Sequence, residues 1–269
     1  MTRSIAAELL TLRKRASTWI LMGIWTALAV FFGFVLPYLT GAPTQELLPQ
    51  NLHTAVILGF PFFGGVFAIM LGVLAIGSEY GWDTLKTLFT QRPSRLQVFA
   101  AKLAALAVVL AAFVVAVFAA GAVAGSVIGQ VEGAAVAAPP AGLLLRALGA
   151  GWLILAAWAA FGVLLAVLSR GTALAIGVGI VYTLVVEGLV SALASVVSWL
   201  EPLVEFLVRA NAYSLITPLG LSPQDVAIEG PGAYFGPFVA GQQALVVLAA
   251  YIAGFVMLSA LLLRRRDVA

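Results

Sequence analysis

Six long apolar runs constrain this chain more than any other feature of its sequence. A helix needs roughly 20 apolar residues to cross a membrane, because the hydrocarbon core is about 30 Å thick and a helix rises about 1.5 Å per residue. We therefore expect transmembrane helices at 18–38, 54–76, 98–128, 147–168, 172–199 and 239–263. The first run is longer than the apolar region of a signal peptide, so we expect it to stay in the mature protein. The predicted fold class is an all-α integral membrane protein with six transmembrane helices in one domain, residues 1–269.

The composition excludes a soluble globular domain. Hydrophobic residues make up 63% of the chain and charged residues only 9%, whereas a soluble domain has about 25% charged residues. The chain has no cysteine, which excludes disulfides and thiolate metal ligands. His53 is the only histidine and lies at a predicted span boundary, so a metal or proton role is the less favoured interpretation. We expect no metal site in this chain.

The basic residues predict how the chain is oriented in the membrane. Of the 14 Lys and Arg residues, only Arg146 and Arg209 fall on one side of the predicted topology. Because basic residues are retained on the cytoplasmic side during insertion, we expect both termini in the cytoplasm and the protein in the cell membrane. The net charge of +3 then reflects this topology and contact with anionic lipid, and not a nucleic-acid partner.

Two segments outside the spans have helical patterns. Residues 2–17 read as an amphipathic helix on the inner membrane surface, with apolar side chains on one side and a basic cluster at its end. A basic tail that only sets the topology fits the same pattern equally well. The longest predicted outer loop, 199–238, begins with Glu201 and Pro202 followed by apolar residues at helical spacing, which predicts a short helix at the outer membrane face.

Glycines recur at intervals of four or eight residues in two of the spans. They are Gly64 and Gly72 in the second span and Gly121, Gly125 and Gly129 in the third. Such rows let helix backbones approach closely where no hydrophobic effect drives association. We interpret these glycines as helix-packing positions. Pro61, inside the second predicted span, is expected to kink it.

Glu187 is the one acidic residue deep in a predicted span. Seventeen residues separate it from Arg170, which puts it roughly 25 Å from the inner boundary, in the outer part of the bilayer. A charge there is costly and marks function by default, but a water-exposed or paired carboxylate would fit this depth too. Gly188 beside it offers a helix break that would make the segment to Trp199 re-entrant. Gln242 could line the substrate path, although an interfacial position is favoured.

A charged and aromatic segment, residues 79–102, lies between the second and third spans. A helix from about Tyr80 to Thr90 would put Trp82, Leu85 and Phe89 on one broad face. It should end near Gln91, because proline disfavours helical geometry in the residue before it. A cytoplasmic helix with such a face either lies on lipid or fills a groove in a partner. An ordinary solvated loop is the plain alternative.

This segment resembles the cytoplasmic loop after the second span in permease subunits of ABC-2 type exporters. The matching residues are Glu79, Tyr80, Thr84, Leu85, Lys86, Leu88, Phe89, Pro93, Ser94, Arg95 and Lys102. Asp83 departs from the family, where glycine often precedes the threonine. The order of spans, the surface helix and the long loop before the last span resemble the family too.

The resemblance implies that residues 79–95 form a coupling helix seated in a groove of an ATP-binding subunit. The contact residues it implies are Glu79, Tyr80, Trp82, Asp83, Thr84, Leu85, Lys86, Leu88, Phe89, Arg92 and Arg95. The chain has no GxxxxGK[ST] loop, so ATP and Mg²⁺ are expected in a separate partner, present in two copies. Two permeases, identical or related, would form the path for an amphipathic or hydrophobic substrate such as a drug, antibiotic or lipid.

Two other functions fit the sequence less well. A secondary transporter or channel using Glu187 would show several ionisable groups and repeated, broken spans, and the sequence offers chiefly Glu187 and no visible repeat. An intramembrane enzyme needs a cluster of acids, histidines or an activated nucleophile. The sequence suggests no such cluster and no catalytic residue, so we expect a transport subunit and not an enzyme.

Overall fold

A computed structural model describes residues 2–81, 94–194, 196–221 and 236–265. All regular structure in these ranges is helical, and six segments are long and apolar enough to cross a membrane. They are Ala16–Leu39, Phe60–Ser78, Leu96–Val131, Ala141–Ser169, Ala173–Ala194 and Gly241–Arg265. The predicted all-α fold with six spans is therefore confirmed.

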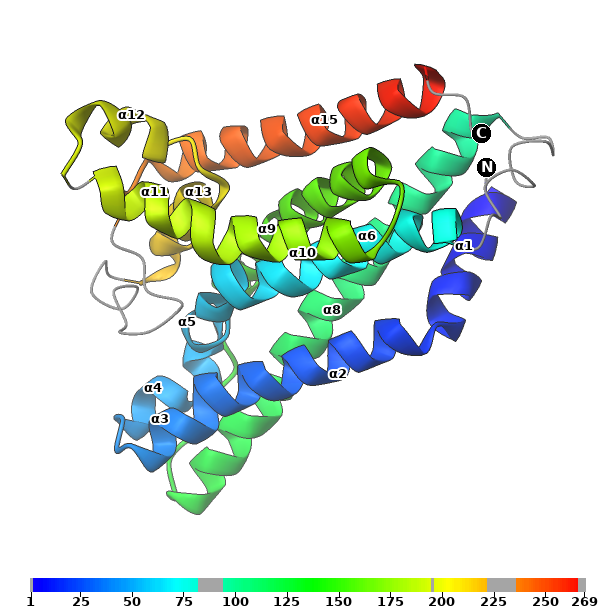
Figure 1. Cartoon of the computed structure of the whole chain (residues 1–269). Helices are drawn as coiled ribbons and strands as arrows, with labels where there is room; N and C mark the ends of the chain where they lie inside the picture. The colour runs from blue at the N-terminus through cyan, green and yellow to red at the C-terminus, as the bar shows by residue number, and fades with distance from the viewer. Residues whose placement is uncertain (1, 82–93, 195, 222–235, 266–269) are drawn as a thin grey trace.

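The N-terminal part of the chain turns sharply between its first two helices. Helix α1 (Thr2–Lys14) ends at Arg15, whose extended backbone starts a new direction. The first span then runs through α2 (Ala16–Val30), the π-helical η1 (Phe31–Val35) and α3 (Leu36–Leu39). Figure 1 shows α1 set at an angle to α2 and lying beside the start of α8.

The second span begins later than its apolar run. Short elements α4 (Thr44–Leu47), η2 (Pro49–Asn51), α5 (Leu52–Ala55) and η3 (Ile57–Gly59) come first. The span itself consists of η4 (Phe60–Gly64) and α6 (Gly65–Gly81). Pro61 lies in the π-helical turn η4, where its missing N–H removes one α-helical hydrogen bond.

The third and fourth spans are long, regular helices. Helix α8 (Arg95–Val131) starts at Ser94, whose N–H donates to Gln97 Oε1 at 3.1 Å. Helix α9 (Ala141–Ser169) ends at Arg170, which is left-handed with a φ of 54°. The fifth span follows as α10 (Ala173–Val181), the π-helical η5 (Tyr182–Val186) and α11 (Glu187–Ala194).

The segment between the fifth and sixth spans contains more than the single short helix expected. Its residues 196–221 contain η6 (Ser198–Leu200), α12 (Glu201–Val204), α13 (Val208–Ile216) and η7 (Thr217–Leu219). The last span is α15 (Gly241–Arg265). Helix α13 is almost wholly buried and packs against α15, α9 and η4.

Helices α6 and α9 form the centre of the bundle. In the most apolar stretches of the second and fourth spans 72% of the residues are buried, against 11% in the first and sixth spans. The two central helices approach at two glycines: a Cβ on Gly72 would meet the carbonyl oxygen of Ala159, and a Cβ on Gly162 would meet that of Ile69. Because each glycine lies on the other helix's backbone, this contact tolerates no side chain at either position.

The bundle has two distinct ends (Figure 1). Helix α1, the last turn of α6, the first turn of α8 and the last turn of α15 gather at one end. Helices α11, α12 and α13 lie at the other end, together with the start of α15. The first and last described residues of the chain thus lie at the same end.

Candidate functional site

The predicted coupling segment falls largely outside the described residues. Trp82, Asp83, Thr84, Leu85, Lys86, Leu88, Phe89 and Arg92 all lie there, and so does most of the helix expected at 80–90. Glu79 and Tyr80 belong to the last turn of α6, and Arg95 is the first residue of α8. The structure therefore describes the two helices that hold this loop.

Both of these helices are tied to α1 by charged side chains. Lys102 of α8 donates to both carboxylate oxygens of Glu8 in α1, each at 2.8 Å, and the lysine side chain is only 5% exposed. Arg15, at the end of α1, donates to the carbonyl oxygen of Leu74 in α6 at 2.7 Å. Helix α1 thus connects the two helices that flank the 79–95 loop. The sequence pattern did not predict this connection.

Glu187, the candidate transport residue, is fully buried and caps a helix. Its Oε1 accepts a hydrogen bond from the N–H of Val208 at 3.1 Å, and its Oε2 accepts one from the N–H of Arg209 at 3.0 Å. These are the first two N–H groups of α13, which have no partner within their own helix. A carboxylate at a helix N-terminus is favoured further by the helix dipole. Leu207, the capping residue, has no side chain able to do this.

The helix break suggested at Gly188 is absent. Helix α11 continues from Glu187 to Ala194, and the irregular turn lies just before it, at η5. This turn interrupts the regular helix immediately before Glu187, whose carboxylate meets α13. A π-helical turn is a common device at positions where a span must present a side chain in a special direction.

Arg209, counted with the outer loop in the sequence, is buried as well. Its guanidinium lies 5.0 Å from the ring centroid of Phe62 in η4 and 5.8 Å from that of Tyr213 in α13. Such cation–π contacts stabilise a desolvated arginine. The residue therefore links α13 to the π-helical start of the second span.

The sixth span holds the same segment from the other side. The hydroxyl of Tyr251 in α15 donates to the carbonyl oxygen of Phe206 at 2.9 Å, and the N–H of Val239 donates to Ser214 Oγ of α13 at 3.0 Å. Gln242, weighed for the substrate path, is exposed on the first turn of α15. It takes no part in this group of contacts.

Four of the five glycines expected at helix contacts lie against another element, and Gly129 lies against the connecting segments at Val136 and Leu48. A Cβ on Gly64 would lie 3.0 Å from Leu155 and Trp25, one on Gly121 2.6 Å from Val56, one on Gly125 2.5 Å from the carbonyl oxygen of Leu47, and one on Gly129 2.5 Å from Val136. Gly72 has been described above. Gly162 was not selected from the sequence, although Ala166 four residues later gives it the same small-residue spacing.

The described residues hold no group of three metal-ligating side chains. His53 is buried in α5, and its Nδ1 has no hydrogen-bond partner among the residues that the structure describes. Burial lowers the pKa of His53 below its ordinary value. The neutral form is therefore favoured in the folded protein.

Six apolar helices, with α6 and α9 at their buried centre, define a multi-pass membrane protein. A protein-family model for "ABC-2 family transporter protein" matches residues 4–186. The match covers more than half of the chain, so this protein belongs to the ABC-2 transporter family. No curated protein matches the chain.

The family resemblance seen in the 79–102 segment is thus confirmed, and the chain is a membrane transport permease. Members of this family are not catalytic themselves and normally work with an ATP-binding subunit. The matched region contains α1 from Ser4 onward and the entire 79–95 loop but stops one residue before Glu187. The contact of Glu187 with α13 and that of Arg209 with Phe62 therefore come from the structure alone.

Proposed function

We propose that this protein is the membrane-spanning permease subunit of an ATP-driven exporter, and that the 79–95 loop docks into a separate ATP-binding subunit. The proposal rests on the contacts made by the two helices that flank this loop. Its two flanking helices are both held by α1, through the pairs Glu8–Lys102 and Arg15–Leu74. Because both flanking helices are held in this way, a force that a partner applies to the loop would move the helices and would not only bend the loop.

The packing of α6 supports a mechanical path from this loop to the opposite end of the bundle. Helix α6 starts the loop, packs closely on α9, and is continuous with η4. Helix α9 and η4 both contact α13, and Arg209 of α13 lies over Phe62 of η4. Since close-packed helices move as discrete bodies and do not deform continuously, a shift of α6 would be felt at α13.

The expected partners follow from this arrangement. Two ATP-binding subunits would bind ATP and Mg²⁺, and two permeases, identical or related, would enclose the substrate path. Both termini would lie in the cytoplasm of a cell-membrane protein, because α1, the last turn of α6, the first turn of α8 and the end of α15 share one bundle end, and most of the basic residues of the sequence belong to these segments and the loop that α6 and α8 flank. The weakly charged interior favours an amphipathic or hydrophobic substrate, such as a drug, antibiotic or lipid-like molecule.

A secondary transporter or channel that works through Glu187 is the less favoured function. Both carboxylate oxygens of Glu187 already accept backbone hydrogen bonds from α13. A cycle of protonation or ion binding at this carboxylate would break the cap of a buried helix in every turnover. The observed contacts favour a structural use of the charge.

Co-purification with the ATP-binding subunit tests the proposed function. A neighbouring reading frame with GxxxxGK[ST] supplies the candidate partner. Trp82→Asp should abolish its co-purification while the permease still inserts in the membrane. Trp199→Asp is the matched control, because Trp199 is exposed in η6. This element directly precedes α12, which lies at the opposite end of the bundle. Retention of the partner at wild-type stoichiometry by Trp82→Asp would refute the docking role of the loop.

A further inference from the structure

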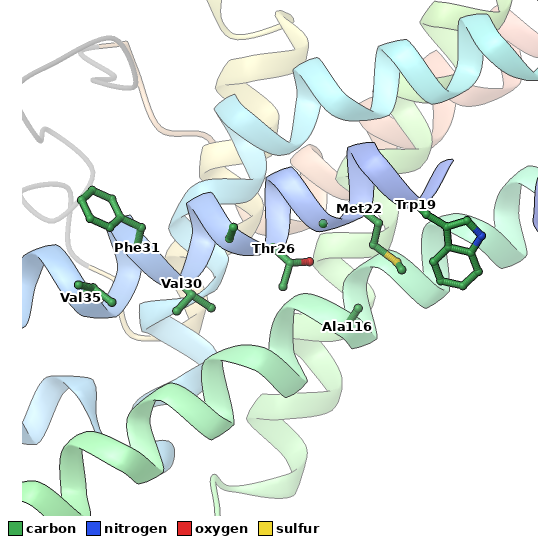
Figure 2. Close-up of a pocket in the computed structure, with 9 residues that line it drawn as sticks. Trp19, Met22, Thr26, Val30, Phe31, Val35 and Ala116 are labelled. Carbon is green, nitrogen blue, oxygen red and sulfur yellow. The ribbon is translucent and has the colours of Figure 1, made fainter. Parts of the chain in front are cut away.

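A long apolar groove lies on the surface between α2 and α8, with a volume of about 790 Å³ (Figure 2). Its floor is made of small residues, Gly23 and Ala27 on α2 and Ala116 on α8. Larger side chains of the first span, among them Trp19, Met22 and Phe31, stand along it. Nothing lies within 4 Å of a Cβ built on Gly23, so the glycine leaves real space.

The dimensions of this groove suit a single hydrocarbon chain. From Trp19 to Val35 it runs about 24 Å along the helix, which exceeds the half-thickness of roughly 15 Å that one lipid leaflet occupies. An acyl chain of one leaflet can therefore lie in the groove along its whole length.

Two basic residues lie in the last turn of α1, next to the end of the groove at Trp19. The indole Nε1 of Trp19 donates to the carbonyl oxygen of Arg13 at 2.7 Å, which fixes this end of the groove against the last turn of α1. Arg13 and Lys14 in that turn are exposed, and neither forms an ion pair with any residue that the structure describes. A tryptophan at the membrane interface beside two cations is the arrangement that favours an anionic headgroup.

We propose that this groove is a binding site for one anionic phospholipid, with an acyl chain along α2 and α8 and the phosphate headgroup at Arg13 and Lys14. The site is separate from the docking loop and does not depend on the proposed export function. Bound lipid would fill the gap between the first and third spans and stabilise the end of α1. This helix connects the two helices that flank the 79–95 loop.

Lipid retention by the purified full-length protein tests this proposal. The probe is phosphatidylglycerol, titrated into delipidated protein and counted by native mass spectrometry, with phosphatidylcholine in parallel. The wild type should retain one phosphatidylglycerol per chain in preference to phosphatidylcholine. Gly23→Leu should fill the groove and remove this lipid. Gly177→Leu, on an equally open glycine of α10, should retain it.

The headgroup is tested by the double variant Arg13→Gln, Lys14→Gln. Each cation near a membrane surface strengthens the binding of anionic lipid roughly fivefold, so the double variant should bind phosphatidylglycerol about thirtyfold more weakly. Arg264→Gln, Arg265→Gln removes two exposed cations from α15 at the same end of the bundle and should have little effect.

Several outcomes would overturn the proposal. Equal retention of phosphatidylglycerol by the wild type and by Gly23→Leu would show that the groove does not hold the lipid. Equal affinity for phosphatidylcholine would remove the role of the two cations. A change from dimer to monomer in Gly23→Leu, with lipid retention unaltered, would assign the groove to a second copy of the chain. All of these readouts are independent of ATP and of the partner subunit.

Discussion

Oε2 of Glu187 accepts the backbone N–H of Arg209 at 3.0 Å, so an acid of the fifth span caps a helix that begins 21 residues later in the sequence. The acid is fully buried and the arginine is 4% exposed. Through this contact, the fifth span holds α13 in place against η4, α9 and α15. A displacement of α11 therefore has to carry α13 with it or break the cap.

Glu187→Ala should loosen α13. The substitution leaves two buried N–H groups without an acceptor, and loss of a helix cap typically costs about 1–2 kcal/mol. Hydrogen–deuterium exchange should become at least several-fold faster at the N–H groups of Val208 and Arg209. Glu201→Ala, at an exposed acid of α12, is the control and should change nothing at α13. Unchanged exchange in Glu187→Ala would mean that the cap does not stabilise this helix.

Gly72→Ala should destabilise the centre of the bundle. Its new methyl group would meet the Ala159 carbonyl oxygen on α9, and overpacking of this kind typically costs about 1–3 kcal/mol. Thermal unfolding in detergent should occur at a lower temperature than in the wild type. Gly177→Ala adds the same methyl group in open space, so its unfolding temperature should stay near that of the wild type.

Lys102→Glu should detach α1 from α8. The substitution places two carboxylates side by side in a nearly buried position, which is strongly unfavourable. Amide exchange along α1 should become faster, and the charge-swapped double variant Glu8→Lys, Lys102→Glu should recover part of the protection. If the double variant were no better protected than the single one, the ion pair would not be what holds α1.

The stability of the protein should depend on pH through His53. Burial lowers the pKa of His53 below its ordinary value of about 6.5, so the unfolded chain binds a proton more readily than the folded one. The contribution of neutral His53 is complete above about pH 6.5 and is lost as the pH falls from there through the lowered folded-state pKa. His53→Gln should therefore reduce the fall in unfolding temperature as the pH is lowered from 8 to 5.5. The same fall in the variant as in the wild type would contradict the assignment.

The number of spans and the helical fold could be predicted because lipid imposes a length and a polarity on every crossing segment. The start of the second span at Phe60 could not be predicted, because residues 54–59 are as apolar as the span itself and are divided into short helical turns by packing. The recurring glycines in the sequence identified α6 and α8 as helices that pack closely against other parts of the protein. The approach of Gly162 to Ile69 depends on which helices become neighbours, which hydropathy does not determine.

The setting of Glu187 shows the same limit. Its depth and charge marked it as unusual, but its partners are backbone N–H groups of Val208 and Arg209, and these leave no trace in a pattern of side chains. Arg209 was assigned to a loop because the apolar runs around it are short. Its burial depends on the rings of Phe62 and Tyr213, and Phe62 lies far from it in the sequence.

Transport in reconstituted vesicles tests the central claim most directly. The permease is placed in vesicles with and without its ATP-binding partner, and the movement of a panel of amphipathic fluorescent dyes is followed before and after addition of ATP and Mg²⁺. We predict dye movement only when the partner, ATP and an intact 79–95 loop are all present. Equally fast movement in vesicles that contain the permease alone would contradict the account.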